Sequence, residues 1–114
     1  MICRVIHAAS IFLALFAIVP TVHAENLLVE QKNKTFVNKG TKVDLLKIKI
    51  GDTIEFKNLD PYFHNVFSLS DTKLFDLGSY PEGQSRSVTF DKAGKVEVEC
   101  AIHPNMKMTV EVVK

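Results

Sequence analysis

The sequence predicts an all-β protein, a Greek-key β-sandwich of about seven to eight short strands. Apolar and polar residues alternate over many short runs, and turn-forming residues separate those runs. In addition, no long stretch repeats its apolar residues with the spacing of a helix. Many short strands joined by turns are typical of a sandwich in which each strand buries one face.

The clearest predicted strands are 43–50 and 53–57, which a turn-forming Gly-Asp pair separates. In the second run, Ile54 and Phe56 fall on one face, with a charged residue between them. The segment 70–84 carries one proline and two glycines, so we expect a long surface connection there. The other expected strands are 27–31, 35–38, 64–69, 86–90, 95–100 and 108–112.

Residues 1–24 have the pattern of a secretory signal peptide. A positively charged start containing Arg4 precedes an almost wholly apolar run at 8–19, and small residues lead to a cleavage site after Ala24. The apolar run is shorter than the roughly 18 to 20 residues that span a bilayer. We therefore expect a cleaved leader and a single folded domain at 25–114, with no membrane association after cleavage.

The composition argues against nucleic acid as a partner. Apolar residues make up 46% and charged residues 24% of the chain, which is ordinary for a globular domain. The formal net charge is only +1, so there is no basic excess to neutralise phosphates.

The expected domain contains few residues that bind transition metals. It has one cysteine, Cys100, and two histidines, His64 and His103, together with the methionines Met106 and Met108. A lone cysteine in an oxidising compartment cannot form an internal disulfide. It is therefore buried, paired with another chain, free and reactive, or bound to a metal.

Three potential ligands lie within seven residues, between the last two predicted strands. Cys100 offers a thiolate, His103 an imidazole and Met106 a thioether. Soft sulfur ligands favour copper, and two histidines with one cysteine and a weak axial methionine form an electron-transfer copper site. The second histidine is then His64, at the start of a predicted strand. A zinc site with an open position is an alternative, but it would leave Met106 without a role.

These residues resemble the cupredoxins of the plastocyanin and amicyanin group. The motif C-x-x-H-P-x-M begins at Cys100, and Phe63-His64-Asn65-Val66 resembles the H-N-V segment of the same group. The resemblance implies a cupredoxin-like fold, one copper ion, and an Asn65 side chain that ties the histidine strand to the cysteine loop. The chain departs from the group at Val98, where an aromatic residue is common, so an electron route through such a ring is in doubt.

The axial ligand has two candidates. Met106 matches the short amicyanin-like spacing and precedes the last strand, whereas Met108 matches the longer plastocyanin-like spacing. Met108 is in register with Val110 and Val112, which favours a core position for its side chain. We therefore predict His64, Cys100, His103 and Met106 as the metal ligands.

The predicted function is a periplasmic electron carrier that cycles one copper between Cu(I) and Cu(II). We expect a monomer, not an enzyme, that meets a redox protein such as a cytochrome or a dehydrogenase transiently. An apolar surface for that partner is expected around His103, from Pro61, Tyr62, Phe63, Pro104 and Met106. The alternative function is a periplasmic copper-binding protein for copper tolerance or delivery, which would use the same site.

Overall fold

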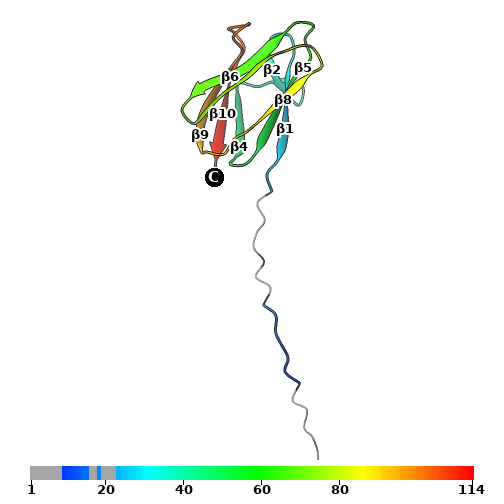
Figure 1. The fold of residues 1–114 in the computed structure, drawn as a ribbon, viewed down its shortest axis with the longest axis vertical. Helices are drawn as coiled ribbons and strands as arrows, with labels where there is room; N and C mark the ends of the chain where they lie inside the picture. Colours follow the sequence, from blue (N-terminus) through cyan, green and yellow to red (C-terminus); the bar gives the residue numbers. More distant parts are fainter. Residues whose placement is uncertain (1–8, 16–17, 19–22) are drawn as a thin grey trace, which may run out of the picture.

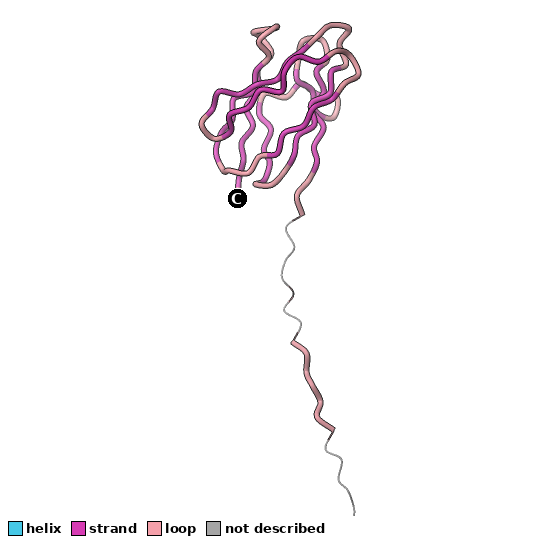
Figure 2. The backbone as a smooth tube through the Cα atoms, in the orientation of Figure 1, coloured by secondary structure: helices cyan, strands magenta, loops and turns pink. Residues whose placement is uncertain are grey.

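The computed structural model describes residues 9–15, 18 and 23–114, and these residues form ten strands and no helix (Figure 1; Figure 2). The strands are β1 (Asn26–Gln31), β2 (Phe36–Asn38), β3 (Thr41–Lys42), β4 (Leu45–Lys49), β5 (Thr53–Asn58), β6 (His64–Ser70), β7 (Lys73–Tyr80), β8 (Ser85–Thr89), β9 (Gly94–Glu99) and β10 (Lys107–Val113). None of the described residues belongs to a helix long and apolar enough to cross a membrane.

The strands form two five-stranded sheets, which confirms the predicted sandwich. One sheet has the order β3-β2-β1-β5-β8 and the other the order β4-β10-β9-β6-β7. Strand β1 pairs with β5 in parallel, and β10 pairs with β4 in parallel, while the other pairs are antiparallel. The parallel pairs join segments from different parts of the chain, so long connections run between the sheets.

The core lies between the two sheets and follows the alternation in the sequence. In β5 the side chains of Ile54 and Phe56 are fully buried, and the charged residue between them is exposed. In β10 the same period buries Met108, Val110 and Val112. Apolar side chains on the inner faces of both sheets therefore supply most of the stabilisation by burial.

The expected surface connection at 70–84 is wrong, because residues 73–80 form the strand β7. This strand lies at the edge of its sheet and pairs only with β6. Its pairing is interrupted by a bulge opposite Val66, where Gly78 adopts a φ of 71°. Gly78, Pro81 and Gly83 had indicated a loop here. Strand β7 and the short strand β3 are the two strands beyond the eight expected, so ten form.

The segments that contain the predicted ligands lie at one end of the sandwich. The connection 100–106 lies at the end remote from the C-terminus (Figure 1). Strand β6 begins at that same end, so its first residue lies beside this connection. The predicted leader at 1–24 falls largely outside the described residues, so the cleavage after Ala24 and the domain bounds 25–114 stay predictions.

Candidate metal centre

Cys100 follows the end of β9 and begins a short, self-closing loop. Its N–H donates to the Met106 carbonyl oxygen at 3.2 Å, and the Met106 N–H donates to the His103 carbonyl oxygen at 2.9 Å. These two bonds fold the loop back on itself before β10 begins. As a result, the Cys100 side chain is buried and His103 turns back toward it.

His64 is the first residue of β6 and is fully buried. Its Nε2 lies 2.7 Å from Oδ2 of Asp60, and Asp60 is itself only 3% exposed. Because a carboxylate can only accept hydrogen bonds, the proton of the neutral ring is on Nε2. The lone pair on Nδ1 is therefore free to bind a metal.

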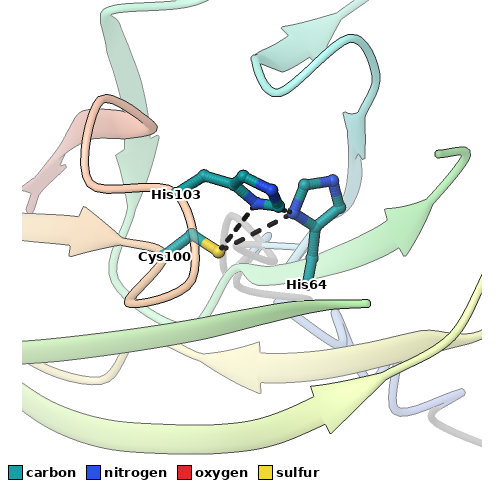
Figure 3. Close-up of side chains that lie close together, drawn as sticks. All are labelled: His64, Cys100 and His103. Carbon is teal, nitrogen blue, oxygen red and sulfur yellow. Dashed lines mark hydrogen bonds between the residues drawn. The ribbon is translucent and has the colours of Figure 1, made fainter. Parts of the chain in front are cut away.

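The structure brings the three predicted nitrogen and sulfur ligands to one point (Figure 3). Cys100 Sγ lies 3.7 Å from His64 Nδ1 and 3.9 Å from His103 Nδ1. The two Nδ1 atoms lie 3.1 Å apart. Among the described residues this is the one cluster of three or more His, Cys, Asp or Glu side chains with metal-binding geometry.

These separations fit a first-row transition metal ion held by all three atoms. Such ions form bonds of about 2.0 Å to nitrogen and about 2.3 Å to sulfur. Three ligands arranged around one centre at those lengths lie roughly 3.5 to 3.8 Å from one another. The two nitrogen–sulfur distances are close to this range, and the two Nδ1 atoms, at 3.1 Å, lie closer together than such a centre requires. The donor set is soft, with a thiolate and two imidazoles, which favours copper over magnesium or calcium.

Both candidate axial methionines are buried, but in different settings. Met106 ends the self-closing loop and is 1% exposed. Met108 lies within β10, opposite Val98 of β9, and both side chains belong to the buried apolar core. Met106 as the axial ligand stays a prediction, and its position in the ligand loop agrees with it.

The predicted tie between the histidine strand and the cysteine loop is confirmed. Oδ1 of Asn65 accepts a hydrogen bond from the Ala101 N–H at 2.7 Å. Asn65 follows one ligand and Ala101 follows another, so this bond fixes the two ligand segments relative to each other.

The surface beside His103 differs from the predicted one. Phe63 is 54% exposed, as expected for part of an apolar patch, but Met106 is buried and contributes no surface. Ile102, which the sequence analysis left out, is 46% exposed beside His103. Its place inside the ligand loop was the signal that could have identified it.

An aromatic side chain packs against both histidines. The Tyr62 ring centroid lies 5.3 Å from that of His64 and 5.2 Å from that of His103. The Lys34 ammonium also lies over the Tyr62 ring, 5.5 Å from the ring centroid. Tyr62 thus limits the rotation of the two imidazole rings.

The electrostatics of the site favour a neutral His103 and an ionised Asp60. Burial lowers the pKa of His103, and the nearby His64 and Lys34 lower it further, against a weaker opposing effect of Asp60. Burial tends to raise the pKa of Asp60, but the N–H groups of Lys34 and Asn33 and the His64 ring together hold that pKa below its usual value.

Comparison with known proteins identifies the family. The model of the copper-binding proteins of the plastocyanin/azurin family matches residues 24–113. The chain belongs to this family.

The methylamine utilization protein MauL of Methylorubrum extorquens is 34% identical over 68 residues, which cover 59% of this chain. The match spans 60% of the length of MauL. A Cu(I) form of an amicyanin mutant has a TM-score of 0.68 at 23% identity, covering 77% of this chain and 82% of that one. A reduced form of another amicyanin mutant has a TM-score of 0.68 at 24% identity, covering 81% and 86%. At these identities the amicyanin structures establish the fold alone.

Proposed function

We propose that this protein carries single electrons between redox partners through one type 1 copper ion, without catalysing a reaction of its own. The observation that carries the proposal is the convergence of His64 Nδ1, Cys100 Sγ and His103 Nδ1 within 4.8 Å at one end of the sandwich. Copper bound there supplies the exchange between Cu(I) and Cu(II). We propose Met106 as the fourth, axial ligand.

The chain's own residues would keep the ligands in nearly the same place in both oxidation states. His64 and Cys100 are buried and leave little space for water to bind in their place. Asn65 and Asp60 hold the ligand segments through hydrogen bonds. A site that changes little between two charge states exchanges electrons with little reorganisation, which suits a carrier.

The partner would approach over His103, which is only partly buried. Phe63 and Ile102 expose apolar surface beside it, and Pro104 is also exposed. A small, partly apolar contact suits a transient electron-transfer encounter. The partner class we propose is a soluble cytochrome or a dehydrogenase, in the periplasm, where a leader at 1–24 would direct the chain.

The test is the visible and electron paramagnetic resonance spectrum of the domain with one equivalent of copper(II). We expect an intense thiolate-to-copper band that reductant bleaches and oxidant restores. Cys100→Ser should abolish the band completely, because oxygen cannot replace the charge transfer from sulfur.

Val96→Ala is the matched control. Val96 is buried in β9, the strand that leads to Cys100, but it offers no ligand atom. It should cost stability and keep the band. An unchanged spectrum in Cys100→Ser would remove Cys100 from the site. A wild-type chain that binds Cu(I) tightly but shows no reversible band would favour copper delivery over electron transfer.

A further inference from the structure

We infer that the carboxylate of Asp60 is the positioning residue that favours the oxidised state of the copper site by holding His64 with a negative charge. This inference rests on the proposed electron-transfer function and adds a residue to it. Asp60 does not touch the metal position. It would act through the His64 ring, to which it is bonded at 2.7 Å.

The Asp60 carboxylate is held on several sides. Its Oδ1 accepts the Asn33 N–H at 2.7 Å, and its Oδ2 accepts the Lys34 N–H at 3.0 Å and faces His64 Nε2. Its own backbone N–H donates to Oδ1 of Asn58 at 2.8 Å. The carboxylate therefore cannot turn away from His64 without breaking two or more hydrogen bonds.

The turn that supplies the two N–H groups has an unusual backbone. Asn33 and Lys34 have positive φ values of 53° and 56°, and Lys32 and Thr35 exchange two backbone hydrogen bonds around them. This is a two-residue hairpin turn of the kind that normally favours Asn-Gly, so the left-handed conformation of Lys34 costs free energy. The turn compensates part of that cost by directing two N–H groups at Asp60, which links the β1–β2 hairpin to a metal ligand.

No lysine or arginine among the described residues forms an ion pair with Asp60. Its carboxylate contacts the neutral His64 ring, and the Lys34 ammonium lies over the Tyr62 ring instead. A buried negative charge interacts strongly with nearby charges because the surroundings screen it poorly. Oxidation adds one positive charge to the site, so an ionised Asp60 favours the oxidised form, and its hydrogen bond makes His64 a stronger donor.

The experiment compares Asp60→Asn with Asp52→Asn by redox titration of the copper-loaded domain. The first change keeps the size of the side chain and removes its charge next to His64. The second removes the charge of another buried aspartate, which accepts two backbone N–H groups at the end of the sandwich away from the predicted ligands. We expect Asp60→Asn to shift the equilibrium at least tenfold toward Cu(I), which is about 59 mV for one electron. Asp52→Asn should shift it less than twofold.

An equal shift in both variants, or a shift below twofold in Asp60→Asn, would overturn the inference. If Asp60→Asn does not fold, ¹⁵N NMR of the metal-free wild-type domain decides instead. A protected proton on Nε2 of His64 supports the inference, and a proton on Nδ1 overturns it. The proposed function fails separately, when the wild-type domain shows no reversible copper–thiolate band.

Discussion

Each end of the sandwich contains a buried aspartate that accepts two backbone N–H groups, yet only one of them contacts a metal ligand. At the ligand end, Asp60 is 3% exposed and accepts the N–H groups of Asn33 and Lys34. At the opposite end, Asp52 is 4% exposed and accepts those of Lys49 and Glu25, at 2.8 and 2.9 Å. Both tie a turn to a distant segment.

The difference lies in the third contact. Asp52 contacts the backbone N–H groups of Lys49 and Glu25 at the end of the sandwich away from the predicted ligands, so its charge acts on a turn and not on the metal centre. Asp60 also faces the His64 ring. A buried carboxylate is a common way to satisfy backbone donors, and its additional contact with a ligand side chain gives it a role in function. Substitutions of Asp52 should therefore change the stability of the domain, whereas substitutions of Asp60 should also change the reduction potential of the copper site.

The largest effect on stability that tests this comparison is expected from Asp52→Ala. The change leaves the N–H groups of Lys49 and Glu25 without their acceptor, which should lower the free energy of unfolding by about 2 to 3 kcal/mol. Chemical denaturation of the metal-free domain measures the loss. The copper spectrum should stay unchanged, and a shifted absorption band would show that the two ends are not independent.

A smaller effect on stability, but a selective one on the potential, is expected from the two methionines. Met106→Leu and Met108→Leu both keep the buried volume, so each should cost less than about 1.5 kcal/mol. If Met106 is the axial ligand, its replacement should shift the reduction potential more than that of Met108 does. Redox titration of both variants measures the order, and the reverse order would move the axial assignment to Met108.

The sequence predicted the ligand loop well because its geometry is local. Cys100 and His103 are three residues apart, and the turn between them needs no distant contact to bring them together. His64 lies far away in the sequence, and it was predicted because the expected domain has no other histidine besides His103 and because residues 63–66 resemble the H-N-V segment of the cupredoxins. The alternation in β5 and β10 likewise predicted which residues face the core.

The sequence could not predict features that depend on packing between distant segments. The sequence analysis did not select Asp60, because its bonds to Asn33 and Lys34 form only when the β1–β2 hairpin packs beside residues 59–63. Its position four residues before His64 was a weak signal, since such spacing has meaning only once the loop shape is known. Strand β7 was missed for a similar reason: its pairing with β6 overrides the turn preference of Gly78.

The mildest prediction concerns pH, and it again distinguishes the two ends. Burial lowers the pKa of His103 below its ordinary value of 6.5, so the folded metal-free domain binds this proton less readily than the unfolded chain does. The stability that this shift contributes is complete above pH 6.5 and is lost as the pH falls from there through the lowered pKa. His103→Gln should therefore flatten the pH dependence of unfolding between about pH 7 and 5, whereas Asp52→Asn should keep it. Denaturation curves across that range measure both slopes, and a stability that rises on acidification, or a slope that His103→Gln leaves intact, would contradict this assignment.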